Sequence, residues 1–234
     1  MSAPKTLEAL IAEVRATLPD PVQFAAVPCT SCGELGILAT CETCVARVKA
    51  AKELRERQIR NACFPPRYAW ADSGAPELAY RVRESSAGNA AQTLAAMSGN
   101  RQPTITLAGG AGCGKTSLAV AFAMTQRRPF FAAVAGMERA LQAAISADRD
   151  EARRVHDKID YARTCGVLVL DDLGKEAGTK LSPVRDILHH RHESELLTVV
   201  TTGQSERQIC ERYDEGTERR LFEDSSALVI RWRT

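Results

Sequence analysis

The residues best suited to chemistry in this sequence form a glycine-rich run from Gly109 to Thr116, Gly-Gly-Ala-Gly-Cys-Gly-Lys-Thr. The run matches GxxxxGK[ST], the spacing of a phosphate-binding loop. Its glycines let consecutive backbone N–H groups turn toward a phosphate, Lys115 brings a cation to the β and γ oxygens, and the Thr116 hydroxyl reaches Mg²⁺. We therefore expect a nucleoside triphosphate to bind here. The expected contacts are Gly109, Gly110, Ala111, Gly112, Cys113, Gly114, Lys115, Thr116 and Ser117.

The segments on either side of this loop fit a nucleotide site. Residues 104–108 alternate β-branched and apolar side chains like a short buried strand, and residues 115–126 have the composition of a helix. A flexible glycine turn that matches the pattern by accident is the alternative. Such a turn has no need of a strand before it and a helix after it, so the context favours phosphate binding.

A second candidate feature is an apolar run, residues 165–170, that ends in Asp171 and Asp172. Ligands in open α/β sheets gather at the carboxyl ends of the strands. There Asp171 is expected to hold the magnesium shell, and Asp172 to orient or deprotonate the attacking water. The alternative is an aspartate pair that caps a turn. Because many related ATPases have the longer Glu in place of Asp172, we expect slow hydrolysis.

Two further polar groups are candidates for the same site. Thr202 ends the predicted strand 197–202 and is expected near the γ-phosphate, together with Gln204, although threonine is also common in strands for its β-propensity. Arg220, next to Arg219, offers a guanidinium that would complete a neighbouring subunit's site. A solvated arginine pair is the alternative.

Four cysteines form two closely spaced pairs, Cys29/Cys32 and Cys41/Cys44. Four thiolates in two CxxC knuckles suit tetrahedral zinc, and so short a segment needs a metal to fold. A redox-active CxxC pair is the alternative, but the segment has no βαβ pattern around it. We expect a zinc ribbon with these four ligands. The helix that follows it is basic, and contact with phosphate backbones and a solvated face are equally good explanations.

The rest of the chain suggests one α/β core. Strands predicted at 104–108, 130–135, 167–170, 197–202 and 227–230 alternate with helices, which is typical of a parallel sheet covered on both faces. One helix is expected within residues 78–97, and an amphipathic helix with Val155, Ile159 and Ala162 on its buried face within 148–163.

The predicted organisation has three parts: an N-terminal amphipathic helix and linker (1–28), the zinc-ribbon module with its basic helix (29–66), and an ATPase core without a C-terminal lid (67–234). The net charge of +2 is too small to imply nucleic-acid binding by itself. With no export signal and no run of about 20 apolar residues, we expect a soluble cytoplasmic protein with no membrane contact.

These features occur in an order that resembles the DnaC/DnaI-type bacterial helicase loaders, AAA+ ATPases close to the IstB-type transposition helpers. The order comprises CxxCG, a second cysteine pair, a basic helix, Pro-Pro-Arg-Tyr at 65–68, the phosphate loop, Leu-Val-Leu-Asp-Asp-Leu-Gly at 168–174, and a Thr-Thr strand end. The resemblance covers most of residues 29–230 and implies an AAA+ P-loop NTPase core with a five-stranded parallel sheet, preceded by the zinc-ribbon-like module.

The resemblance also implies a cofactor and partners. The cofactors would be ATP, Mg²⁺ and Zn²⁺, and the partners a hexameric replicative helicase, single-stranded DNA and further copies of the chain in an ATP-dependent homo-oligomer. Lys115, Thr116, Asp171 and Asp172 match the family's nucleotide site, and Arg220 matches its trans-acting arginine. The chain differs from the family at Gly203, where Asn is usual, and in lacking a Ser-Tyr-Arg ending.

Three functional hypotheses follow from the sequence. The first is an ATPase that loads a replicative helicase during DNA replication, which the cysteine module favours. The second is an ATPase helper of a transposase. The third is a non-hydrolysing adaptor that ATP switches between conformations, which Gly203 and Asp172 keep open.

Overall fold

The computed structural model of the protein describes residues 27–28, 35–36, 44, 49–50, 63–177 and 183–232. The chain divides into two compact units, Met1–Arg55 and Glu56–Thr234. The whole of the predicted N-terminal helix, most of the basic helix, and Cys29, Cys32 and Cys41 lie outside the described residues.

In the first unit the described strands form a small antiparallel pair. Strand β1 (Val27–Pro28) pairs with β2 (Leu35–Gly36), with Val27 opposite Gly36 and Pro28 opposite Leu35. Cys29 and Cys32 fall between these two strands in the sequence. The predicted zinc knuckles stay a prediction, because Cys29, Cys32 and Cys41 lie outside the described residues.

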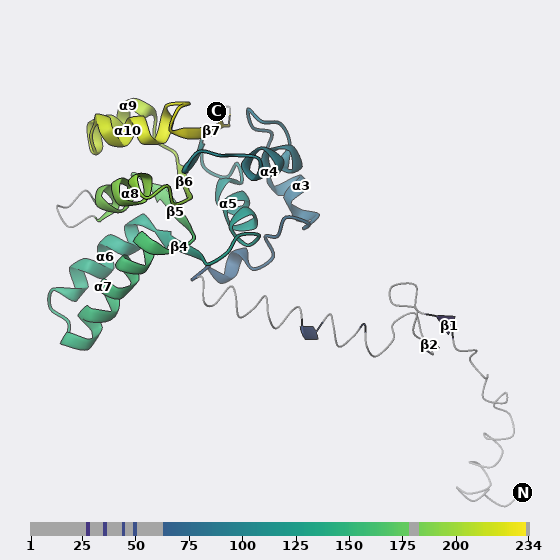
Figure 1. Ribbon diagram of the computed structural model, residues 1–234, viewed down its shortest axis with the longest axis horizontal. Coiled ribbons are helices and arrows are strands. Elements are labelled where there is room, and N and C mark those ends of the chain that lie inside the picture. The colour runs from purple at the N-terminus through teal and green to yellow at the C-terminus, as the bar shows by residue number, and fades with distance from the viewer. Residues whose placement is uncertain are drawn as a thin grey trace, which may run out of the picture. The chain divides into compact units, whose positions relative to one another are not determined.

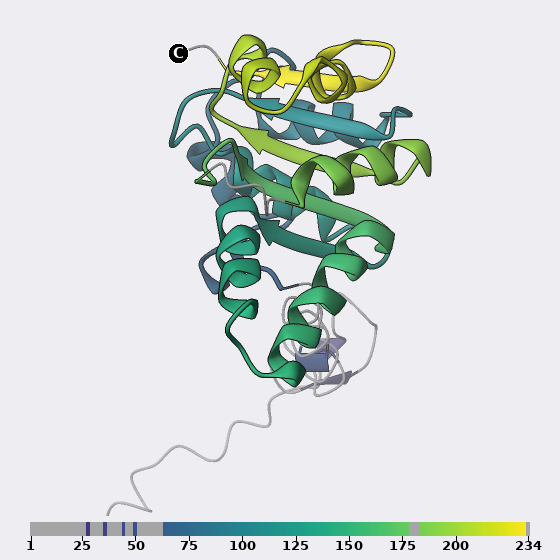
Figure 2. The ribbon, with the colours of Figure 1, turned by 90° about the vertical axis from the view of Figure 1, so that its left-hand side faces the viewer.

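The second unit is built on a five-stranded sheet in which every neighbouring pair is parallel (Figure 2). The strands follow the order β4-β5-β6-β3-β7 across the sheet. Their bounds are β3 Thr104–Ala108, β4 Pro129–Ala133, β5 Val167–Leu173, β6 Thr198–Thr202 and β7 Ala227–Arg231. The predicted α/β class and the predicted five-stranded parallel sheet are confirmed.

Helices cover both faces of the sheet (Figure 1). A short 3-10 helix, η1 (Pro66–Tyr68), precedes them. One face carries α3 (Glu77–Arg81), α4 (Ala90–Ser98) and α5 (Lys115–Ala123). The other carries α6 (Val134–Ala144), α7 (Arg149–Thr164), α8 (Val184–Glu193), α9 (Glu206–Arg212) and α10 (Glu215–Phe222).

Strand β5 explains why the sheet needs helices on both sides. Val167 and Val169 belong to the core on the α5 face, whereas Leu168 and Leu170 belong to the core on the opposite face. All four are at most 4% exposed. Since successive strand residues point to opposite faces, a continuous apolar run can be buried only between two layers of helices.

The prediction of one helix within residues 78–97 is wrong. The structure has two short helices there, α3 and α4, separated by a non-helical segment. Asn89 starts α4 with a capping box, in which it exchanges hydrogen bonds with Gln92. The segment between the helices bonds to the phosphate loop, through Arg83 N–H and the Cys113 carbonyl (3.2 Å). A continuous helix would leave that edge of the loop unsupported.

No helix in the described part of the chain is long and apolar enough to cross a membrane.

Candidate nucleotide-binding site

The glycine-rich run forms a tight loop between β3 and the first turn of α5. Gly114, which directly precedes α5, has φ = 98°, and a Cβ there would lie 2.8 Å from Cγ2 of Val82. Only glycine fits this left-handed, closely packed position. Gly112 also has positive φ (75°), but a Cβ there would meet no atom within 4 Å. The loop is therefore packed on its inner side and open where a phosphate would enter.

The loop is held in place by segments far away in the sequence. Trp232, which directly follows β7 and is only 4% exposed, is fixed by two hydrogen bonds. Its backbone N–H donates to the Ala108 carbonyl and its indole N–H to the Arg83 carbonyl, both at 2.9 Å. A Cβ on Gly109 would lie 2.8 Å from Cβ of Trp232. These contacts fix the start of the loop against the segment that leads into it.

Lys115 points back over its own loop. Its ammonium group donates to the carbonyls of Gly109 and Gly110, both at 2.6 Å, and the residue is only 8% exposed. Two neutral carbonyl oxygens are weaker partners for an ammonium ion than phosphate oxygens are, because a phosphate also carries negative charge that attracts the ammonium group. A triphosphate in the loop would therefore attract Lys115 away from these carbonyls.

Asp171 lies at the meeting point of three elements. Its Oδ1 accepts hydrogen bonds from the hydroxyls of Thr116 in α5 (2.7 Å) and Thr201 in β6 (2.8 Å). Burial raises the pKa of Asp171 above its usual range, although the two hydroxyl hydrogen bonds oppose the shift. A magnesium ion would favour the ionised carboxylate, so the structure places a carboxylate and a hydroxyl, both oxygen ligands, where that ion is expected.

A bulge in β5 sets the two aspartates apart. The pairing of β5 with β6 shifts between Leu170 and Leu173, and Asp172 within this interval has φ = 60°. Because Asp172 is not paired with β6, its N–H donates to the Thr201 hydroxyl at 2.9 Å. One threonine thus bonds to both aspartates, and the extra residue turns them in different directions.

A polar cavity of about 290 Å³ opens beside the loop. Its walls are Tyr68, Arg81, Ala111, Gly112, Gly114, Lys115, Thr116, Ser117, Asp172 and Lys175. Most of the predicted phosphate contacts and Asp172 are among these residues. Sequence reasoning missed Arg81 and Lys175, because neither belongs to a recognisable motif. Arg81 stacks on the Trp70 ring, with 4.5 Å between its guanidinium carbon and the ring centroid, and Lys175 forms an ion pair with Asp172.

Comparison with known proteins assigns this arrangement to a family. The family described as "IstB-like ATP binding protein" matches residues 27–207, well over half of the 234 residues. The chain belongs to the IstB-like ATP binding protein family. No curated protein matches it.

This IstB-like chain also has structural neighbours. A crystal structure of the DnaC helicase loader matches with a TM-score of 0.55 and 23% identity, covering 71% of this chain and 99% of that one. A DnaA replication initiator bound to AMPPCP and single-stranded DNA matches with a TM-score of 0.51 and 15% identity, over 68% of this chain and 51% of that one. A crystal structure of DnaI matches with a TM-score of 0.47 and 25% identity, covering 61% of this chain and 82% of that one. The resemblance predicted from the motifs is confirmed.

The structure brings Thr202 beside the start of the phosphate loop, because its carbonyl accepts a hydrogen bond from Gly109 N–H at 3.1 Å, and its predicted role near the γ-phosphate stays a prediction. Its buried hydroxyl donates to the Leu173 carbonyl (2.9 Å) and accepts from Gln204 N–H (3.0 Å), and Thr202 is not among the described residues that line the cavity. In this IstB-like chain the neighbouring Thr201 contacts the acidic pair. The two threonines are adjacent and point to opposite faces of the sheet, which no local pattern distinguishes.

Arg220 does not line the described walls of the cavity. It lies on α10, where its charge lowers the pKa of His192 on α8, after the larger effect of burial, and contributes to the lowered pKa of Asp214. It therefore does not belong to the nucleotide site of its own chain. Its predicted role in a neighbouring subunit's site stays a prediction.

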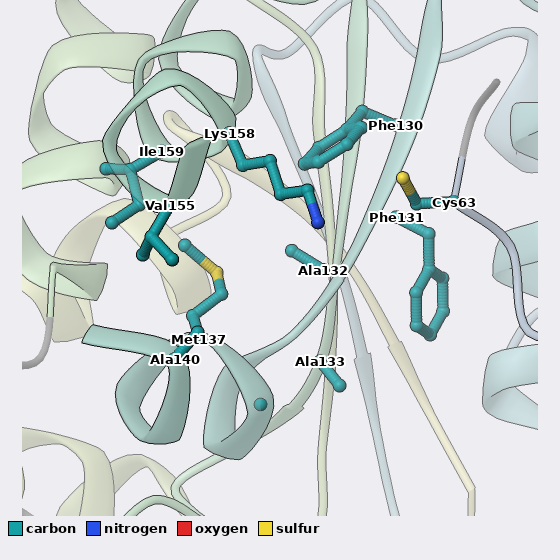
Figure 3. A pocket seen from close by; sticks show the side chains of 11 residues that line it. Cys63, Phe130, Phe131, Ala132, Ala133, Met137, Ala140, Val155, Lys158 and Ile159 are labelled. Carbon is teal, nitrogen blue, oxygen red and sulfur yellow. The ribbon is translucent and has the colours of Figure 1, made fainter. Parts of the chain in front are cut away.

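A second hollow, of about 250 Å³, is apolar and lies between β4 and the helices α6 and α7 (Figure 3). Phe130 and Met137 face it, and Lys158 supplies the single charged group among its described lining residues. Its described lining residues include no carboxylate and no part of the phosphate loop. It is therefore unsuited to a triphosphate, and the polar cavity is the better nucleotide site.

The polar cavity fits Mg·ATP chemically. The ion would supply charge that neutralises the phosphates, and Thr116 and Asp171 would hold it. Among the residues that the structure describes, no group of three or more His, Cys, Asp and Glu side chains is placed to hold a metal ion. That result is compatible with magnesium, which is usually bound through one or two carboxylates together with phosphate oxygens and water. Of the predicted zinc ligands, only Cys44 falls within the described residues.

Proposed function

We propose that this chain is an ATPase that uses ATP binding and slow hydrolysis to place a replicative helicase on single-stranded DNA. The observation that carries the nucleotide part of this proposal is the hydrogen bond between Thr116 and Asp171 at the edge of the polar cavity. It brings the end of the phosphate loop and the acidic end of β5 together, 55 positions apart in sequence. The two groups that would share a magnesium ion are thus already neighbours.

The helicase part of the proposal is supported by the comparison with DnaC. That protein is described as a helicase loader, and nearly its whole described length, 99%, aligns with this chain. The DnaA structure was solved with a nucleotide analogue and single-stranded DNA, which fits an ATP-dependent protein of DNA replication. Because the identities are below 25%, these neighbours support the fold, and the partners remain our proposal.

The cysteine module would supply the partner contact. We propose that Cys29, Cys32, Cys41 and Cys44 bind one zinc ion, and that the basic helix after them approaches DNA or the helicase. The proposal is supported by the antiparallel pairing of β1 with β2, which flank Cys29 and Cys32 in the sequence. Elemental analysis of the purified chain should find about one zinc, lost when Cys29 and Cys32 are changed to Ser.

A transposase helper is the second candidate, and the match to the IstB-like family favours it. The two candidates share the ATPase site and differ in the partner. Affinity purification with tagged wild-type protein from the native cell distinguishes them. Co-purification of a replicative helicase supports the loader, whereas a transposase without a helicase overturns it.

The nucleotide part is tested with Lys115→Ala. The wild-type chain should bind Mg·ATP, and the variant should lose at least about tenfold in affinity because a charge-assisted contact is removed. Arg207→Ala is the matched control, since Arg207 is an exposed cation that pairs with Glu211 on α9, outside the described cavity walls. Equal affinity in the Lys115 variant and the control would contradict the site. Binding without any hydrolysis in the presence of helicase and DNA would favour the adaptor hypothesis.

A further inference from the structure

The ion pair between Lys175 and Asp172 lies inside the wall of the nucleotide cavity. The two charged groups are 2.9 Å apart, and both residues line the cavity together with residues of the phosphate loop. Exposed ion pairs between residues three positions apart contribute little to stability. Structural support alone is therefore a weak explanation for a lysine that faces a proposed triphosphate site.

The backbone on both sides of Lys175 is firmly held. Gly174 has φ = 93°, and a Cβ there would lie 2.6 Å from Cγ of Gln204, so glycine is required. Gly174 N–H donates to the buried carboxylate of Glu176 at 3.1 Å, and that carboxylate also pairs with Arg212. Lys175 N–H in turn donates to the Asp172 carbonyl at 3.1 Å. The position of Lys175 beside the cavity therefore follows from a fixed turn.

The side chain of Lys175, by contrast, is free to move. It is 59% exposed, and Asp172 is the salt-bridge partner found for it among the described residues. Asp172 offers one negative charge, while a terminal phosphate carries about 1.5 to 2 at neutral pH. An ammonium ion within reach of both is attracted more strongly by the phosphate. A triphosphate in the cavity would thus compete with Asp172 for Lys175.

We propose that Lys175 is a sensor of the terminal phosphate: its ammonium group holds Asp172 in the nucleotide-free chain and transfers to the γ-phosphate when ATP binds. The transfer releases the Asp172 carboxylate toward the space where a water molecule would attack. The inference rests on the proposed function, because it takes the cavity as the ATP site. It adds that the chain distinguishes ATP from ADP through a residue outside the phosphate loop.

The test compares the binding of Mg·ATP and Mg·ADP by the full-length chain. Lys175→Met keeps the length of the side chain and removes its charge, and Lys175→Arg keeps the charge. We expect Lys175→Met to weaken ATP binding by about tenfold and ADP binding by less than about twofold, since one charge-assisted contact is lost to the γ-phosphate alone. Lys175→Arg should keep the preference for ATP within about threefold of the wild type. Arg207→Ala, which removes an exposed cation from α9 outside the described cavity walls, should leave both affinities unchanged.

The outcomes separate this inference from the proposed function. If the wild-type chain binds neither nucleotide, the proposed function fails and the role of Lys175 falls with it. If the wild-type chain binds ATP and Lys175→Met keeps the same ratio of ATP to ADP affinity, only the role of Lys175 is overturned. An equal loss for both nucleotides would likewise contradict it, because it would mean that Lys175 supports the cavity and does not sense the γ-phosphate.

Discussion

The carboxyl group of Asp171 is proposed to bind magnesium, but its burial makes its charge unfavourable for stability. Asp171 is 3% exposed and accepts two hydroxyl hydrogen bonds, yet burial still raises its pKa. A carboxyl group whose pKa is higher in the folded than in the unfolded chain makes folding less favourable as the pH rises through the interval between the two values. At neutral pH the buried charge of Asp171 therefore destabilises the nucleotide-free protein.

We predict that Asp171→Asn stabilises the nucleotide-free chain at pH 7.5 and removes its stabilisation by Mg·ATP. The amide oxygen still accepts from Thr116 and Thr201, while the buried charge is gone. The gain should shrink as the pH falls through the raised pKa of Asp171 and disappear below the unfolded value of about 3.9, because the carboxyl group is then neutral in both states. Urea unfolding over this pH range, with and without Mg·ATP, measures these differences. A variant that is less stable than the wild type at pH 7.5 without nucleotide would contradict the prediction.

The residues of the site that could be predicted from the sequence were those that belong to a motif. The phosphate loop and Asp171 have fixed spacings because the chemistry of phosphate and magnesium requires them. Thr201, Arg81 and Lys175 could not be found in this way. Thr201 reaches the site only because β5 bulges beside it, and Arg81 lies there because the chain before β3 folds back onto the loop.

At the scale of elements, the strands were predictable and several helices were not. The five strands have short runs of β-branched and apolar residues, and their predicted bounds agree with the structure to within about three residues. Helices α6, α9 and α10 were expected only from the alternation of strands and helices, and the sequence analysis gave them no bounds. The bulge in β5 was likewise invisible, because it depends on the partner strand and on a non-glycine residue with positive φ.

The bulge leads to a prediction about two buried threonines in neighbouring strands. Thr201 in β6 donates to Asp171 and accepts from Asp172 N–H, whereas the hydroxyl of Thr106 in β3 has no hydrogen-bond partner among the described residues. Thr201→Val should lower the free energy of unfolding by about 1–3 kcal/mol, because it removes the hydrogen bond to the buried Asp171 carboxylate and leaves the partly buried Asp172 N–H without this acceptor. Thr106→Val, a change of the same shape, should be neutral or stabilising.

Chemical denaturation of the two valine variants and of Thr201→Ser measures this contrast. Thr201→Ser keeps the hydroxyl and should retain most of the stability and of the Mg·ATP affinity. Equal effects of the two valine substitutions would show that the Thr201 hydrogen bonds do not hold the bulge.

At the scale of the whole molecule, the nucleotide site of one chain is open on one side and is not reached by Arg220. The described walls of the cavity contain Lys115, Arg81 and Lys175, while Arg220 lies on α10 beside His192 and Asp214. If Arg220 acts on ATP, it must do so in a neighbouring copy. A head-to-tail contact between copies would bring α10 of one chain to the cavity of the next, and such contacts close into rings or continue as filaments.

We therefore predict that Arg220→Ala binds Mg·ATP as the wild type does. Its hydrolysis should be slower than that of the wild type, and this difference should appear only when the copies are assembled. Mixing it with Lys115→Ala tests the arrangement, because neither variant alone has a complete site. In an equal mixture of head-to-tail assemblies, about a quarter of the interfaces pair an intact phosphate loop with an intact Arg220, so a similar fraction of the wild-type rate should return. Steady-state ATPase assays at fixed total protein measure this recovery. A mixture that stays as inactive as its components would mean that Arg220 does not complete the site of a neighbour.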